Sequence, residues 1–250
     1  MALHSFSHSL RAEVTKALTL RSTQITLCAA LLVPTILALA SGLAFDPTRK
    51  NAFPIESHGF ETAGFGQPLV ILLAALIVGA EYTDGQLRTT LLATPKRGQV
   101  LAAKLTLVAV VGAVIGAVAI GAAVLVKHVA LGADGLAPQE FTSAMGWNLL
   151  GVSANYALIA IVAACITVLA RTYIVTLVVL VPLVLGLTIS LLGVFPVLKY
   201  LPDLAGIQLL MPYPGVDLLS PIAGGVVMAA WATVLIGGSW AVARLRDTGS

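Results

Sequence analysis

The sequence predicts an all-α, polytopic membrane protein with six membrane-spanning helices. Six stretches of at least 19 residues contain no Asp, Glu, Lys or Arg: 22–45, 62–80, 105–126, 141–170, 172–198 and 218–243. About 20 apolar helical residues cross the roughly 30 Å hydrocarbon core of a bilayer. A charged side chain at its centre costs at least about 2.5 kcal/mol, so charge-free stretches of this length indicate spans.

The composition supports the same fold class. Hydrophobic residues make up 58% of the 250 residues, charged residues 10%, and the mean hydropathy is +0.99. Soluble proteins carry about 25% charged residues. The two cysteines, Cys28 and Cys165, both fall in apolar stretches and offer no disulfide framework. The sequence therefore leaves little room for a separate soluble domain, and residues 1–250 are expected to form a single transmembrane domain.

The basic residues orient the predicted spans. With a cytoplasmic N-terminus, ten basic residues lie inside, at 11, 16, 21, 88, 96, 97, 104, 171, 244 and 246. Only Arg49, Lys50, Lys127 and Lys199 lie outside. This asymmetry is typical of the positive-inside rule and predicts that both termini are cytoplasmic in a multi-pass cell-membrane protein. Because the basic residues cluster at span ends, the pI of 9.0 does not indicate nucleic-acid binding.

The N-terminal residues have two alternative interpretations. Residues 7–21 place Leu10, Val14, Ala17 and Leu18 on one face, which predicts a short amphipathic helix in the cytoplasmic interface. The alternative there is a solvated, loosely helical tail. Basic residues before an apolar run, with Ala38-Leu39-Ala40 after it, also resemble a cleaved signal peptide. We favour a retained span, because the apolar run continues through Phe45 and the peptide would be long.

The spans and their connections follow in order. The sequence predicts membrane-spanning helices at about 22–44, 64–82, 102–126, 144–169, 173–195 and 220–243. Arg171 alone separates the fourth and fifth spans, which predicts a tight hairpin. Residues 196–219 contain four prolines and an apolar piece too short to span, so we expect an outer re-entrant or interfacial segment there. Residues 83–101 form a cytoplasmic loop between the second and third spans.

The loop after the second span contains the most specific motif. Glu81 and Tyr82 end the span, Asp84-Gly85 marks a turn, and Leu87 and Leu91 recur four residues apart beside Arg88. Pro95 closes this segment, and Lys96, Arg97 and Lys104 are expected to return the chain to the membrane at headgroup level. A short amphipathic helix here would offer its leucines to a partner.

This stretch resembles the permease subunit of type-2 ATP-binding-cassette (ABC) exporters. The similarity lies in the acidic end of the second span, the Leu-Arg-Thr-Thr-Leu-Leu run, the following Arg and a Leu-x-x-Lys, within a six-span layout. The resemblance implies that the segment from Glu81 to Lys104 includes a coupling helix that docks on an ATPase. The implied coupling residues are Glu81, Gly85, Leu87, Arg88, Leu91 and Arg97. For Glu81, the alternative is a structural carboxylate paired with Arg88 or Arg97. Asp84 makes the turn more acidic than the family pattern.

Polar and small residues within the spans give further candidates. Asn148 and Asn155 lie seven residues apart on one face of the fourth span, where they are candidates for the substrate pathway. The alternative is that both amides bond a neighbouring helix. Gly112 and Gly116, beside Ala113, Ala117 and Gly121, form small-residue ladders that favour close helix packing. This packing is expected within one chain rather than in a dimer interface.

The sequence therefore predicts a half-transporter with no chemistry of its own. It contains no G-x-x-x-x-G-K-[ST] phosphate loop, no catalytic constellation and no metal-site spacing, so we expect no cofactor and no metal. The resemblance implies separate ABC ATPase subunits, a second, identical permease subunit, and export of an apolar or amphiphilic substrate by alternating access. The alternatives are a secondary transporter or channel that needs no ATPase, and a membrane-embedded enzyme or signalling subunit.

Overall fold

The computed structural model describes residues 2–46, 54–82 and 97–245. The chain is helical, and the described residues contain no β-strand. Six helical stretches are long and apolar enough to cross a membrane, which confirms the predicted fold class. These stretches are Arg21–Leu43, Ile55–Tyr82, Gly98–Asp134, Ser143–Ala170, Tyr173–Leu191 and Pro221–Arg244.

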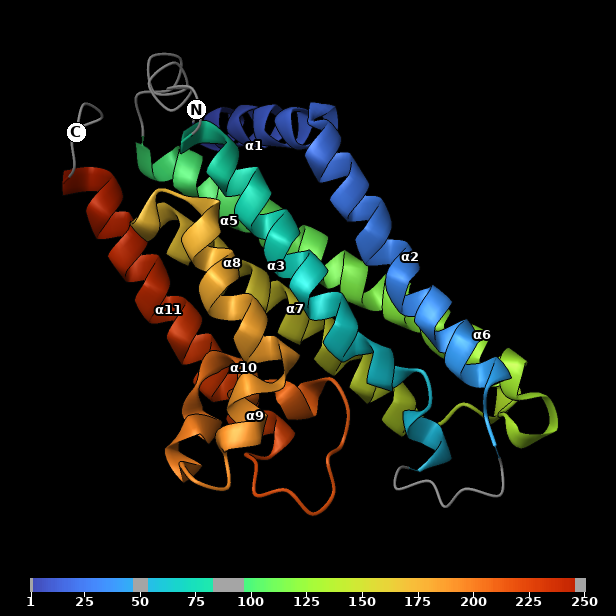
Figure 1. Cartoon of the computed structure of the whole chain (residues 1–250). Helices are drawn as coiled ribbons and strands as arrows, with labels where there is room; N and C mark the ends of the chain where they lie inside the picture. Colours follow the sequence, from blue (N-terminus) through green and yellow to red (C-terminus); the bar gives the residue numbers. More distant parts are fainter. Residues whose placement is uncertain (1, 47–53, 83–96, 246–250) are drawn as a thin grey trace.

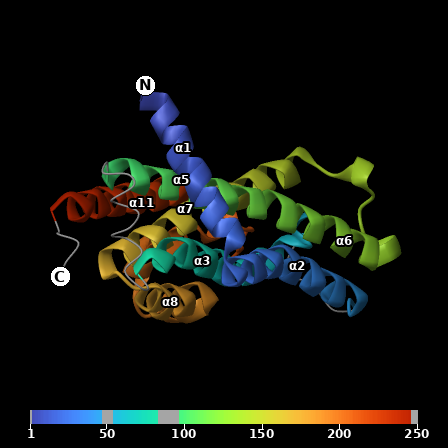
Figure 2. The same ribbon diagram turned by 90° about the horizontal axis from the view of Figure 1, so that it is seen from above.

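The first helix, α1 (Ala2–Thr19), crosses one end of the bundle instead of running along the helices below it (Figures 1 and 2). Only Leu20 separates it from α2 (Arg21–Leu43). The C-terminal end of the last helix, α11 (Pro221–Leu245), lies at the same end of the bundle (Figure 1). On its inner face α1 packs against α5 (Arg97–Ile115) and α2. Of the four apolar residues predicted to share a face, Ala17 is buried in the core and Leu10 and Val14 pack against it, whereas Leu18 is exposed.

The fourth span, α7 (Ser143–Ala170), is the centre of the bundle. It packs against α3 (Ala63–Gly79), α5, α8 (Tyr173–Pro182) and α11. Two glycines allow this approach, because a Cβ at Gly112 would lie 2.6 Å from the Tyr156 carbonyl oxygen and one at Gly116 would lie 2.9 Å from the Ser153 Cα. The small-residue ladder therefore serves packing within one chain, as predicted.

The third span is longer than its charges suggested. It consists of α5, a π-helical turn η4 (Gly116–Ile120) and α6 (Gly121–Leu131). Lys127 was expected to mark the outer end, but the helix continues beyond it. The Lys127 ammonium is buried, 3.2 Å from the Glu61 carboxylate and 2.7 Å from the Ser41 hydroxyl. Because these partners compensate its charge, this lysine need not reach the bulk water.

The turn between the fourth and fifth spans is as tight as predicted. Helix α7 ends at Ala170, Arg171 adopts a left-handed conformation with φ 56°, and Thr172 caps α8 by accepting the Ile174 N–H at 3.3 Å. The fifth span is interrupted by the π-helical turn η7 (Leu183–Leu187), in which Gly186 has φ +113°. It ends with α9 (Thr188–Leu191), before the expected limit at residue 195.

Short helical turns cover the end of the bundle opposite α1. Two of them precede α3: η1 (Ile55–Ser57) and η2 (Phe60–Thr62). A further turn, η3 (Ala80–Tyr82), follows α3 at the α1 end of the bundle. After α6 come η5 (Gly132–Asp134) and η6 (Pro138–Glu140). The segment before α11 forms η8 (Pro196–Tyr200), α10 (Pro202–Ala205) and η9 (Ile207–Leu209), which pack back against α11.

Candidate functional site: a charged cluster and an outer pocket

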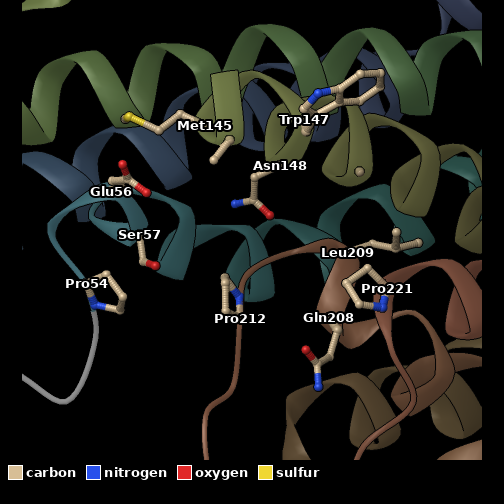
Figure 3. A pocket seen from close by; sticks show the side chains of 12 residues that line it. Pro54, Glu56, Ser57, Met145, Trp147, Asn148, Gln208, Leu209, Pro212 and Pro221 are labelled. Carbon is tan, nitrogen blue, oxygen red and sulfur yellow. The ribbon is translucent and has the colours of Figure 1, made fainter. Parts of the chain in front are cut away.

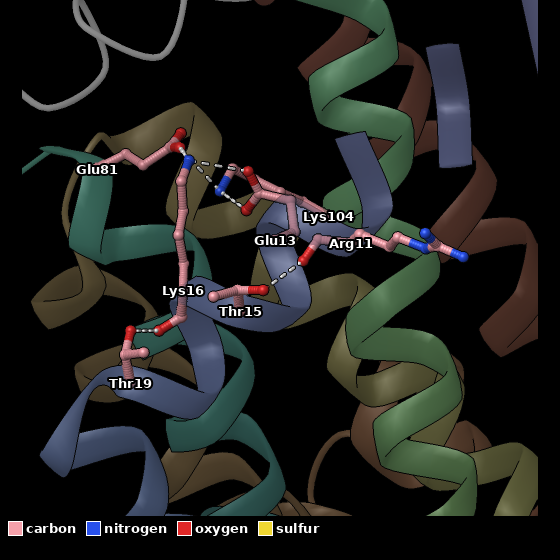
Figure 4. A network of polar contacts seen from close by, with 7 residues as sticks. All are labelled: Arg11, Glu13, Thr15, Lys16, Thr19, Glu81 and Lys104. Carbon is pink, nitrogen blue, oxygen red and sulfur yellow. Dashed lines mark hydrogen bonds and ion pairs between the residues drawn. The ribbon is translucent and has the colours of Figure 1, made fainter. Parts of the chain in front are cut away.

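Four charged side chains meet where α1 crosses the bundle (Figure 4). The Lys16 ammonium lies 3.0 Å from Glu13 Oε1 and 2.8 Å from Glu81 Oε1. The Lys104 ammonium lies 3.1 Å from Glu81 Oε1 and also contacts the other oxygen of Glu13. Each lysine therefore bridges the same two carboxylates. We call these four residues the charged cluster.

The charged cluster is largely withdrawn from water. The side chains of Glu13, Glu81 and Lys104 are 4–5% exposed, whereas that of Lys16 is 43% exposed. Burial alone would lower the pKa of Lys16, but the hydrogen bond and charge of Glu81, together with those of Glu13, outweigh it and raise this pKa above its ordinary value. Two carboxylates and two ammonium groups balance formally, which makes their shared burial tolerable.

The charged cluster joins three separate elements. Glu13 and Lys16 come from α1, Glu81 from the turn η3 that ends the second span, and Lys104 from the second turn of α5. Residues 83–96 connect η3 to α5, so Glu81 and Lys104 hold the two ends of that connection. A displacement of either end would consequently be transmitted to α1 through buried ion pairs.

The sequence singled out only part of this arrangement. Glu81 is in the cluster, and its ion-pair partners among the described side chains are Lys16 and Lys104. The side chains of its alternative partners, Arg88 and Arg97, lie outside the described part. Lys104, expected at headgroup level, is 4% exposed and pairs with Glu13 of α1. Arg97 is the first residue of α5. The remaining coupling candidates, Gly85, Leu87, Arg88 and Leu91, lie outside the described residues.

An open pocket of about 410 Å³ lies at the end of the bundle opposite the charged cluster (Figure 3). We call it the outer pocket, after the side of the membrane on which the sequence is expected to place this end. Its walls come from the turn η1, the first two turns of α7, the η9 segment and the start of α11. Most lining residues are apolar, with a few polar groups among them: Pro54, Glu56, Ser57, Ala144, Met145, Trp147, Asn148, Gly151, Gln208, Leu209, Pro212 and Pro221. The Trp147 residue is 73% exposed, so the pocket has an aromatic rim.

The two asparagines of α7 occupy different environments. Asn148 lines the outer pocket and donates its amide to the Leu210 carbonyl at 3.2 Å. Asn155 is fully buried, accepts the Gln67 amide at 2.8 Å and donates to the Gly206 carbonyl at 2.7 Å. Asn155 thus fixes the segment that forms one pocket wall, while Asn148 faces the space itself. The sequence predicted that both lie on one face of the helix, but it did not predict that one lines a pocket and the other is fully buried.

The described part of the chain contains no group of three or more His, Cys, Asp or Glu side chains arranged to hold a metal ion. In the same part of the chain, the charged side chains of the cluster are paired with one another, and the buried Asn155 amide bonds Gln67 and the Gly206 carbonyl.

Comparison with known proteins adds one independent finding. The family model described as ABC-2 family transporter protein matches residues 9–192. The matched region includes α1 from residue 9 onward, the first five spans and all four members of the charged cluster. No curated protein matches the chain.

Proposed function

Because the chain belongs to the ABC-2 family of transporter proteins, we propose that it is the membrane-spanning permease half of an ATP-driven exporter. The chain is a multi-pass membrane protein and a transport subunit of this family. It has no phosphate-loop sequence, so ATP hydrolysis would occur on separate ATPase chains in the cytoplasm. The single observation that carries this proposal is the match over residues 9–192.

The charged cluster supports a coupling role for the segment between the second and third spans. In this proposal the ATPase contacts Leu87, Arg88 and Leu91, with Gly85 providing the turn and Arg97 starting the return into α5. Movement of the segment then displaces Glu81 and Lys104, whose buried ion pairs carry the displacement to α1. Helices α3 and α5 would move with α1 as one unit, because buried charges resist separation.

The outer pocket supports a pathway for apolar or amphiphilic cargo. Its walls are largely apolar, whereas Asn148 and Gln208 offer amide groups and Glu56 a carboxylate. Such a lining binds an apolar body and orients it through a few polar contacts. We propose that Asn148 contacts the cargo and that Asn155 positions the wall behind it. Two copies of the chain would enclose the pathway and alternate between inward and outward access.

Co-purification with the ATPase tests the coupling assignment. The full chain is co-expressed with the ATPase encoded beside it, and the complex is recovered through a tag on the permease. Leu87→Asp with Leu91→Asp should release the ATPase. The matched control is Ala133→Asp with Ala137→Asp, which adds the same charges at exposed positions on the other end of the bundle and should leave the complex intact.

Three results would contradict the proposal. Failure of the unmodified chain to bind or stimulate any ATPase, together with transport in its absence, would favour an ATPase-independent secondary transporter or channel. Retention of the ATPase by the double leucine variant would remove the coupling assignment. Cysteine labelling of residues 84–97 from the outside would likewise contradict the proposed topology, in which both termini and this segment are cytoplasmic.

A further inference from the structure

Two small pockets adjoin each other beneath the elbow between α1 and α2. The first, which we call the elbow crevice, has a volume of about 90 Å³ and lies among α1, α2, α3 and α5. Its walls are mainly aliphatic: Val14, Ala17, Leu18, Thr23, Gln24, Leu27, Leu73, Ile77, Leu107 and Val111. The second, of about 150 Å³, is lined by the whole charged cluster. Ala17 and Ile77 line both, so a polar and an apolar compartment share one wall.

A buried hydroxyl in the elbow crevice has no hydrogen-bond partner in the described part of the chain. Thr23 is 4% exposed, and its Oγ1 lacks any such partner. By contrast, Thr26, one turn further along the same helix, donates to the Ser22 carbonyl at 2.8 Å. Leaving a buried hydroxyl unpaired is unfavourable, and native proteins rarely do so. The Thr23 hydroxyl therefore indicates a ligand that contains a hydrogen-bonding group at the mouth of an apolar crevice.

The charged residues around the elbow indicate the charge of that ligand. Glu13, the one acidic residue between positions 6 and 22, is buried in the charged cluster. The basic residues of the same stretch reach the surface, since Arg11 and Arg21 are exposed and the Lys16 side chain is 43% exposed. The exposed charged side chains of this stretch are consequently all basic, and Lys16 among them is also paired with Glu13 and Glu81. Lys16 lines the charged pocket and brings that charge to its entrance.

We propose that the elbow crevice and the charged pocket together bind one anionic phospholipid. An acyl chain would occupy the aliphatic crevice, the ester region would hydrogen-bond the Thr23 hydroxyl, and the phosphate would lie beside Lys16. This order of apolar, ester and charged groups is the order met along a lipid molecule at the edge of a bilayer. Anionic lipids concentrate in the cytoplasmic leaflet and attract basic segments at its surface.

The proposed lipid would act on the position of α1. It would fill the space between α1 and the three spans beneath it, next to the ion pairs that hold α1 to η3 and α5. Loss of the lipid would leave α1 held by the charged cluster and by its direct packing against α2 and α5. Binding of this lipid at the elbow requires neither a particular ATPase nor a particular exported compound.

The test measures lipid retained by the full chain. The chain is reconstituted in nanodiscs with equal amounts of phosphatidylglycerol and phosphatidylcholine, released into mild detergent and weighed by native mass spectrometry. Wild type should retain one phosphatidylglycerol per chain in preference to phosphatidylcholine. Ala17→Leu, which fills the shared wall, should lose this lipid. Ala12→Leu makes the same change on the exposed face of the same helix and should retain it.

A second variant keeps the test valid if Ala17→Leu does not fold. Thr23→Val preserves side-chain shape and removes the hydroxyl, so retention of phosphatidylglycerol should fall about fivefold, as expected for one hydrogen bond. Equal retention of the two lipids by wild type would overturn the anionic assignment. Retention by Ala17→Leu equal to that of Ala12→Leu, or by Thr23→Val equal to that of wild type, would overturn the site.

Discussion

Glu81 and Lys104 flank the segment 83–96 and meet within 3.1 Å, although each is buried in a predominantly apolar bundle. Their contact closes the base of that segment. Lys16, which lies 65 positions before Glu81 in the chain, adds a second ammonium to the same carboxylate oxygen. These contacts hold the two ends of the connecting segment and the helix α1 together, so we expect the three to move as one rigid unit.

Removing the buried lysine should destabilise the protein strongly. Lys104→Met leaves two carboxylates to share Lys16, and breaking a buried pair in this way costs about 3–5 kcal/mol. The measurement is thermal unfolding in detergent. Lys199→Met is the matched control, because Lys199 pairs with Asp217 at 2.9 Å on the surface and the Asp217 side chain is 83% exposed. That control should leave the free energy of unfolding almost unchanged, because an exposed ion pair contributes little to stability.

A charge-balanced double variant tests whether the four residues of the charged cluster stabilise the protein together or as independent ion pairs. Glu13→Gln combined with Lys104→Met leaves the Glu81–Lys16 pair, which is neutral overall. The double variant should therefore be more stable than Lys104→Met alone. Additive losses of stability from the two changes would contradict the cooperative arrangement.

The sequence predicted the elements of this region better than their contacts. The amphipathic pattern of residues 7–21 gave a helix and the apolar stretches gave six spans, because each depends on local periodicity. Glu81 was recognised at the end of a span. Its pairing with Lys16 depends on how α1 crosses α3 and α5, which no local pattern contains. Two features of the sequence could have indicated the cluster: the i, i+3 spacing of Glu13 and Lys16, and the position of Lys104 among apolar residues.

The outer pocket was less predictable for the same reason. Asn148 could be placed on a helix face, but Gln208 and Pro212 come from a proline-rich segment whose path is set by packing. Asn155 anchors that path through the Gly206 carbonyl. A sequence shows that a buried amide needs partners, yet it does not show which backbone supplies them.

A side chain at Gly112 should separate α5 from α7. A Cβ there would lie 2.6 Å from the Tyr156 backbone oxygen, which cannot move without displacing α7. We expect Gly112→Val to lower the free energy of unfolding by at least about 1–3 kcal/mol, the usual effect of overpacking. Gly237→Val is the control, since a Cβ at Gly237 meets nothing within 4 Å. Equal thermal stability of the two variants would contradict the observed α5–α7 packing.

Stability should fall as pH rises, because of Asp203. Burial raises the pKa of the Asp203 carboxyl above its ordinary 3.8, and Thr188 provides its side-chain hydrogen bond. The native state then holds a proton that the unfolded state releases, so stability declines from about pH 3.8 up to the native pKa and levels off above it. Asp203→Asn keeps a neutral side chain of the same shape. It should remove this slope and match or exceed the wild-type melting temperature at pH 8, and an unchanged pH profile would contradict the assignment.

Loss of Asn155 should lower stability, whereas loss of Asn148 should alter the response to cargo. Asn155→Leu leaves the Gly206 carbonyl and the Gln67 amide without their partner in the interior, and each such loss costs about 1–3 kcal/mol. The variant should melt at a lower temperature. Asn148→Leu removes one part-buried bond to Leu210 at the pocket wall and should retain most of its stability. Its effect should appear instead in cargo-stimulated ATP hydrolysis by the reconstituted complex. The opposite pattern, a stable Asn155→Leu with altered cargo response, would place the cargo deeper in the bundle than the outer pocket.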